Sequence, residues 1–236
     1  TTFFDESAMD YRLASQLKDL KDLQNSDGSW SWWRGMRGSA SITAQVLQTL
    51  ARLNVMAGYQ KATAKMIENG MDYLRTVVMK EFEEMKRMEK KGQKPMICDY
   101  HAIQYLYINT LLGKNPFYDS DYVELKNYLL KYLEADRHRD IYSKALMAVV
   151  LNGDGKAKKA KEYVESIRQY TVTKPGMGTY FDTWHAGYSW FDYRIPTQTA
   201  AIEALKAVDP ADTETINQMR LWLLQSKRTQ AWDTPI

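Results

Sequence analysis

Cysteine is almost absent from this chain: Cys98 is the single one among 236 residues. One thiol excludes an internal disulfide framework and a zinc site built on several cysteines, but it leaves an exported location open because many envelope proteins contain no disulfides. The chain also lacks an apolar run of about 18 residues, and its first residues lack the basic flank and apolar stretch of a signal peptide. The sequence as given therefore contains no segment that we expect to cross a membrane.

An excess of charge of either sign is equally missing. The 32 Lys and Arg residues stand against 29 Asp and Glu residues, which gives a net charge of +3. This charge is too small and too evenly spread to indicate a nucleic-acid or membrane surface. With 44% apolar residues, the chain has enough material for the core of one domain. We therefore expect one folded domain, with no nucleic-acid partner and no direct membrane contact.

Helical periodicity, by contrast, runs through nearly the whole chain. Leu13, Leu17, Leu20 and Leu23 recur at steps of three and four, which predicts a helix over 9–24 with one buried face. The same reasoning predicts eight more helices, at 41–56, 60–90, 98–112, 121–135, 140–151, 155–170, 197–208 and 212–226. We expect a small β-hairpin within 171–196, a segment rich in glycine and aromatic residues.

Cap residues support these helix boundaries. Ser41 is suited to start the second helix, Asp119 or Ser120 a later one, and Asp212 the last. Gly113 and Gly153 are suited to end helices. The charged second half of 60–90 is predicted to be a solvent-exposed helix tip, and the basic run 155–163 a solvated helix face.

An aromatic motif recurs along the chain. "DGSWSWW" at 27–33 returns in looser form as "GYSWFDY" at 187–193, and a helix follows each copy. A third copy begins in "WLLQSKRTQAWDT" at 222–234. Helical hairpins that bury one face against their neighbours imply a solenoid or a closed ring, since no hairpin is stable alone. The aromatic residues are therefore predicted to be structural.

These residues carry a family resemblance. Gln24, Asp27, Gly28, Ser29 and Trp30 look like the "Q…DGSW" motif of the α/α-toroid superfamily. The closer resemblance is to bacterial α2-macroglobulins of the Bacteroidetes type, on 23–53 and 187–234. The residues that we assign to the structural motif are Gln24, Asp27, Gly28, Trp30, Trp32, Trp33, Trp190, Gln230 and Trp232.

The resemblance implies an all-α fold: an incomplete α/α-toroid of helical hairpins, with 1–236 forming one partial domain of a larger protein. It also implies a protein of the endopeptidase-inhibitor type in the periplasm or cell envelope, whose parent is a lipoprotein. Its partners would be proteases and neighbouring β-sandwich domains. The thioester motif of the family is absent here, and Cys98 has no Glu-Gln after it. None of His101, His138 and His185 matches the catalytic histidine of the complement branch, so we assign no catalytic residue and no cofactor.

Enzymatic toroids are less consistent with the sequence. The Asp-x-Asp-Asp string of protonating terpene cyclases does not occur. Cys98, Asp99 and His101 offer the ligand types of a prenyltransferase zinc site, but at helical spacing Asp99 points away from the other two. We therefore interpret Cys98 as a buried thiol and His101 as a half-buried histidine on a packing helix, and predict no metal site.

Two alternatives remain open. One is a toroid enzyme or carbohydrate-binding domain that uses the central cavity of the ring, and its candidate cluster is Asp182, His185, Tyr188 and Tyr193. The other is an interaction scaffold that traps nothing.

Overall fold

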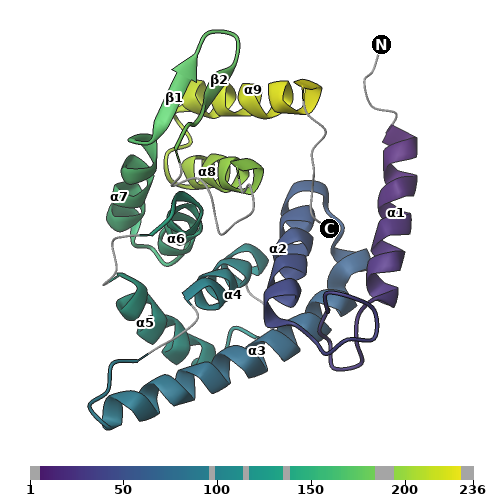
Figure 1. Cartoon of the computed structure of the whole chain (residues 1–236), viewed down its shortest axis with the longest axis vertical. Coiled ribbons are helices and arrows are strands. Elements are labelled where there is room, and N and C mark those ends of the chain that lie inside the picture. The colour runs from purple at the N-terminus through teal and green to yellow at the C-terminus, as the bar shows by residue number, and fades with distance from the viewer. Residues whose placement is uncertain (1–5, 96–98, 114–116, 135–138, 184–193, 230–236) are drawn as a thin grey trace. The chain divides into compact units, whose positions relative to one another are not determined.

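The computed structural model describes residues 6–95, 99–113, 117–134, 139–183 and 194–229, and these residues are mostly helical (Figure 1). Its elements are α1 (Glu6–Asp22), α2 (Ala40–Ala57), α3 (Gln60–Lys90), α4 (Asp99–Leu112), α5 (Ser120–Glu134), α6 (Ile141–Gly153), α7 (Ala157–Arg168), β1 (Thr171–Lys174), β2 (Gly178–Phe181), α8 (Arg194–Val208) and α9 (Thr213–Thr229). The all-α class with one small hairpin is confirmed, and each predicted helix is found within a few residues of its expected bounds. None of the helices in these ranges is both long and apolar enough to cross a bilayer.

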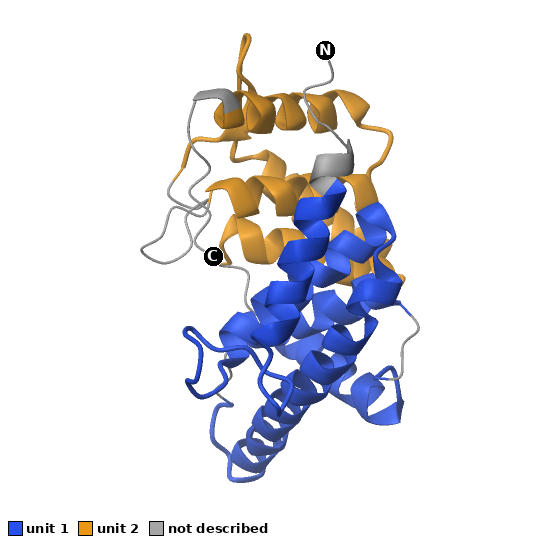
Figure 2. Cartoon of the chain, turned by 90° about the vertical axis from the view of Figure 1, so that its right-hand side faces the viewer, with its two compact units in different colours: residues 1–133 blue, residues 134–236 orange. Residues whose placement is uncertain are grey.

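The chain divides into two compact units, Thr1–Leu133 and Glu134–Ile236, which Figure 2 colours separately. In the first unit α2 packs against both α3 and α4, and α1 packs against α3. The central residues of α4, 102–109, are all buried, as expected for a helix surrounded by others. Helix α5 joins this unit through edge contacts between aromatic rings, Tyr128 with Phe82 and Tyr122 with Tyr105.

The second unit is built around α6, which packs against α7 and α8. Most of α6 is buried, whereas α7 buries only one face, made of Ala160, Val164 and Ile167. Three of the four lysines of the basic run, Lys158, Lys159 and Lys161, are exposed, as predicted, and Lys156 is half-buried. Strands β1 and β2 pair antiparallel from Thr171 opposite Phe181 to Lys174 opposite Gly178, and β2 lies on α9.

Several predicted boundaries are confirmed. The Asp119 carboxylate accepts the N–H of Tyr122 at 2.9 Å, and that of Asp212 accepts the N–H of Thr215 at 3.2 Å, so both residues cap helices. Gly113 follows α4 with a left-handed φ of 63°. The predicted cap of α2, Ser41, is wrong by two residues. The Ser39 side chain accepts the N–H of Ile42 at 3.3 Å and caps the helix, and Ser41 lies in the first turn.

Two predicted faces also need correction. In the leucine stripe of α1, Leu17 is buried but Leu23 lies beyond the end of the helix and is 46% exposed. The charged half of α3 is not a free tip, because Phe82 and Met85 are buried between its exposed charges. This half of the helix therefore contains an apolar stripe, which contacts α5 through Phe82.

Candidate functional site

Trp30 joins three helices of the first unit. Its indole Nε1 donates to the Leu20 carbonyl of α1 at 2.9 Å, and its backbone N–H donates to the Thr43 hydroxyl of α2 at 2.9 Å. A β-carbon added at Gly70 of α3 would lie 2.9 Å from the Trp30 ring, so the ring packs directly on that helix. The side chain is 2% exposed. Trp30 is therefore a packing residue whose only polar atom is satisfied.

The residues before Trp30 form a tight, hydrogen-bonded turn. One Asp27 carboxylate oxygen accepts the Ser29 N–H at 3.0 Å and the Ser29 hydroxyl at 2.6 Å, a local bond typical of Asp in turns. The Gln24 amide donates to the Gly28 carbonyl at 2.9 Å and to the Met66 carbonyl of α3 at 3.0 Å. Gln24 therefore ties the turn to the helix beneath it.

Gly28 lets this turn approach α3 closely. Its φ is 86°, and a β-carbon there would lie 2.1 Å from the carbonyl oxygen of Asn69. Both the left-handed backbone and the close contact exclude any other residue without rearrangement.

Trp32 and Trp33, in contrast, lie on the surface. They are 59% and 69% exposed, and their ring centroids are 6.4 Å apart. The turn beneath them is held by the Ser31 hydroxyl and the Met36 N–H, which both donate to the Trp33 carbonyl. Packing within the unit accounts for Trp30 but not for this pair.

The second unit contains the same kind of turn. Gly178 has a φ of 89°, and a β-carbon there would lie 2.2 Å from the Gln218 carbonyl oxygen of α9. The Gln198 amide donates to the Thr179 carbonyl at 2.8 Å and to the Met219 carbonyl of α9 at 3.2 Å. The Tyr180 ring stacks on Trp222 with centroids 5.8 Å apart.

The two turns share a short sequence pattern that the search for repeats along the chain did not find. "GSW" at 28–30 and "GTY" at 178–180 each place a left-handed glycine, a small hydroxyl residue and an aromatic residue on a helix. The copy predicted at 187–193 lies outside the described residues, as do Trp190, Gln230 and Trp232. A search for glycine, hydroxyl residue and aromatic in succession would have found 178–180.

Of the cluster predicted for a toroid enzyme or a carbohydrate-binding domain, the structure describes one residue, at the end of the hairpin. Asp182 is exposed. Its predicted companions His185, Tyr188 and Tyr193 lie outside the described ranges.

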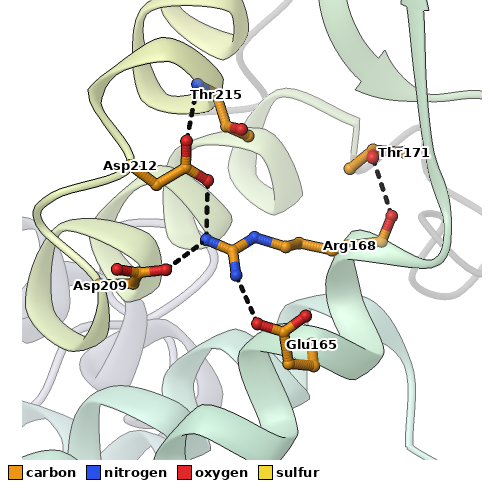
Figure 3. A network of polar contacts seen from close by, with 6 residues as sticks. All are labelled: Glu165, Arg168, Thr171, Asp209, Asp212 and Thr215. Carbon is orange, nitrogen blue, oxygen red and sulfur yellow. Dashed lines mark hydrogen bonds and ion pairs between the residues drawn. The ribbon is translucent and has the colours of Figure 1, made fainter.

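An ion-pair network joins α7 to the turn between α8 and α9 (Figure 3). The Arg168 guanidinium donates to Asp209 at 2.8 Å and to Asp212 at 2.7 Å, and it also pairs with Glu165. Burial opposes ionisation of Asp212, but the Thr215 hydroxyl and N–H and the Arg168 charge outweigh it, so the pKa of Asp212 is lowered. The acidic groups neutralise Arg168 here, so this network is structural.

His101 faces two polar side chains from other helices. Its Nε2 lies 2.8 Å from the hydroxyl oxygen of Ser41 on α2, and its Nδ1 lies 3.6 Å from a carboxylate oxygen of Glu81 on α3. Sequence reasoning missed both partners, because neither is near His101 along the chain. Cys98 is not among the described residues, and within those residues no three His, Cys, Asp or Glu side chains form a group that could hold a metal ion.

Comparison with known proteins adds no assignment: no protein-family model matches the chain, and no curated protein matches it.

Proposed function

We propose that this chain is a helical domain of an α2-macroglobulin-like protein of the bacterial cell envelope, and that the parent protein traps proteases. The part of this domain in that function is to bind other protein surfaces, among them neighbouring β-sandwich domains. The observation that carries the binding role is the exposed pair Trp32 and Trp33 on a hydrogen-bonded turn.

Two adjacent exposed tryptophans are costly to leave in water and are frequent at the centre of protein interfaces. Each ring offers a large apolar area and one N–H donor. The loop that carries the pair is closed by a hydrogen bond from the Ser39 N–H to the Trp30 carbonyl, and the turn before it is tied to α3 through Gln24 and Gly28. Binding a partner therefore orders few additional bonds and loses little entropy. Exposed Arg34 and Arg37 flank the pair and suit a partner surface with acidic residues at its rim.

The family part of the proposal rests on the sequence resemblance, and the distribution of burial supports it. Well-buried helices such as α4 and α6 alternate along the chain with one-sided helices such as α3 and α7. Among the described residues, the glycine–aromatic turn is found in both units. A ring of hairpins with inner and outer helices would have this alternation and this repetition.

The test uses the parent protein that contains this chain. It is incubated with a general protease, and the activity of the recovered complex is measured on a small peptide and on a large protein substrate. Trapping leaves the small substrate accessible and excludes the large one, and it changes the scattering profile of the protein on cleavage. Cleavage without retained protease and without a change in shape would reject protease trapping.

The binding role is tested separately with W32A/W33A. We expect the double variant to weaken the binding of neighbouring domains to this domain at least tenfold, about 1.4 kcal/mol. Tyr11→Ala removes an aromatic residue that is 79% exposed on α1 and serves as the matched control. If tryptophan fluorescence responds to oligosaccharides and not to those domains, a carbohydrate-binding role replaces this proposal.

A further inference from the structure

We infer that Ser41, His101 and Glu81 form a nucleophilic site at which the Ser41 hydroxyl is acylated by short-chain carboxylic esters and then released by water. This activity goes beyond the proposed binding and trapping role and does not depend on it. The inference rests on three side chains from three different helices that meet in the order nucleophile, base and carboxylate.

The distances match that order. The Ser41 oxygen lies 2.8 Å from Nε2 of His101, within the range in which a base can take a hydroxyl proton. The opposite nitrogen, Nδ1, lies 3.6 Å from Oε1 of Glu81. This distance exceeds a hydrogen bond but allows the carboxylate to stabilise the positive charge that the imidazole acquires.

The three groups also differ in exposure as such a site requires: the nucleophile is open to solvent, and the base and the carboxylate are partly buried. Ser41 is exposed, so an ester can reach its hydroxyl from solvent. The side chains of His101 and Glu81 are 14% and 29% exposed, so both groups are largely withdrawn from solvent. A partly desolvated base next to an open nucleophile is the arrangement that activates serine in unrelated hydrolases.

The rest of the first unit holds these groups in place. Helix α2 is capped by Ser39 and fixed two residues after Ser41 by the bond between Thr43 and Trp30. His101 directly precedes the buried part of α4, residues 102–109. Because α2 packs against both α3 and α4, the three side chains are positioned by the core and not by loops.

The reaction balances without a cofactor. The Ser41 oxygen attacks the ester carbonyl carbon while its proton passes to Nε2 of His101, and the bond to the leaving alcohol then breaks as His101 protonates that alcohol. Water repeats the two steps on the acyl-serine, and the products are a carboxylic acid and free Ser41. The N–H groups of Ala40 and Ser41, in the first turn of α2, lie where helix geometry leaves amide donors for the oxyanion.

A second serine of the chain also contacts a basic nitrogen and provides the comparison. The Ser166 hydroxyl accepts from Nζ of Lys144 at 2.9 Å, and burial lowers the pKa of that lysine. In this pair the lysine donates to the serine, and the nearby charge of Asp140 favours the protonated form of Lys144, so the lysine cannot take the Ser166 proton as a neutral imidazole can. We therefore expect an electrophile to select Ser41 over Ser166.

The experiment treats the 236-residue chain with a fluorophosphonate probe and with p-nitrophenyl acetate, and mass spectrometry of the digest identifies the labelled residue. We expect one label per chain on Ser41, no label in S41A, and unchanged labelling in S166A. H101Q should lower the rate by roughly 100-fold and E81Q by less, while the circular dichroism melting curve shows that both remain folded. In the wild type, the rate should rise with pH as His101 changes from the protonated form, which cannot take the Ser41 proton, to the neutral form.

Three results would overturn the inference: labelling of the folded chain that does not exceed that of urea-unfolded chain, labelling of Ser166 as fast as that of Ser41, or a rate that ignores pH between 5 and 8. The wild-type chain alone gives each of these results, so the inference stays testable if a variant does not fold.

Discussion

The two glycine–aromatic turns both bring the backbone into close contact with a helix, but they use different aromatic residues. In the first unit, Gly28 lies on α3 and the aromatic residue is Trp30, which hydrogen-bonds two further helices. In the second unit, Gly178 lies on α9 and the aromatic residue is Tyr180, which stacks on Trp222. In both, a glutamine amide bridges the turn and a carbonyl of the helix. The backbone contact is therefore the shared constraint, and the aromatic side chain is adapted to its surroundings.

The difference between the turns lies in how each is supported. The first is an isolated turn held by Asp27 and Ser29, whereas the second is part of a β-hairpin and receives ladder hydrogen bonds. The glutamines differ too, since Gln198 is 1% exposed and Gln24 is only half-buried. The two turns thus offer matched pairs of substitutions within one chain.

The largest effect is expected from Gly28→Ala and Gly178→Ala. Both glycines have a left-handed backbone, and each added methyl group would lie within 2.2 Å of a carbonyl oxygen of the neighbouring helix. The turn must therefore move away from its helix. We expect each variant to lose about 4 kcal/mol of the free energy of unfolding, measured by urea denaturation. Hydrogen exchange should show increased opening of the unit that carries the substitution.

The controls are Gly35→Ala and Gly176→Ala. Both glycines have a positive φ, but no atom lies within 4 Å of the added methyl group. They should cost about 1 kcal/mol each, the price of the backbone conformation alone. Equal losses in all four variants would show that the close contacts with α3 and α9 do not matter.

The next effect separates the two glutamines. Replacing Gln198 by leucine leaves the Thr179 and Met219 carbonyls without their donor in a dry environment, and we expect a loss of about 2 kcal/mol. Gln24→Leu should lose about 1 kcal/mol, because water can reach the freed carbonyls there. Thermal melting of both variants tests the order, and the reverse order would contradict the assigned burial.

A smaller effect is expected on the pH dependence of stability in acid. The pKa of Asp212 is lowered in the folded chain, so its contribution to stability is present above the unfolded value of about 3.9 and is lost as the pH falls through the folded pKa. Asp212→Asn should therefore cost less than about 1 kcal/mol at pH 7, and the difference from the wild type should shrink by pH 3. Urea midpoints at the two pH values measure it.

Asp119 is the comparable residue of the first unit, because it also caps a helix and pairs with an arginine. Its pKa is lowered by the N–H of Tyr122 and, against some burial, by Arg75. Its side chain is 45% exposed, so solvent screens the pair and Asp119→Asn should have the weaker acid dependence. A stronger dependence at Asp119 would show that exposure does not set the ranking.

The smallest effect on stability is expected from W32A/W33A. Both rings are exposed, so the free energy of unfolding should change by no more than about 0.5 kcal/mol even though the neighbouring Trp30 is essential to packing. Urea denaturation gives the value. A large loss would mean that the pair packs within this chain and is not a binding surface.

The sequence by itself determined the secondary structure. Helix periods, the caps at Asp119 and Asp212 and the glycine-rich hairpin depend on residues within one or two turns of each other, so they can be predicted from local spacing. The same holds for the turn at 27–30, whose Asp, Gly and hydroxyl residues bond one another. The cap at Ser39 was missed because two serines stand close together and local spacing does not choose between them.

Tertiary structure decided which residues face outward and which meet. The difference between buried Trp30 and exposed Trp32 and Trp33 depends on where α1 and α3 pass, because all three tryptophans are equally apolar. Ser41 and His101 are 60 residues apart in sequence, and only the packing of α2 on α4 brings their side chains together. Contacts of this kind depend on how whole helices pack, and no local pattern of residue types encodes that packing.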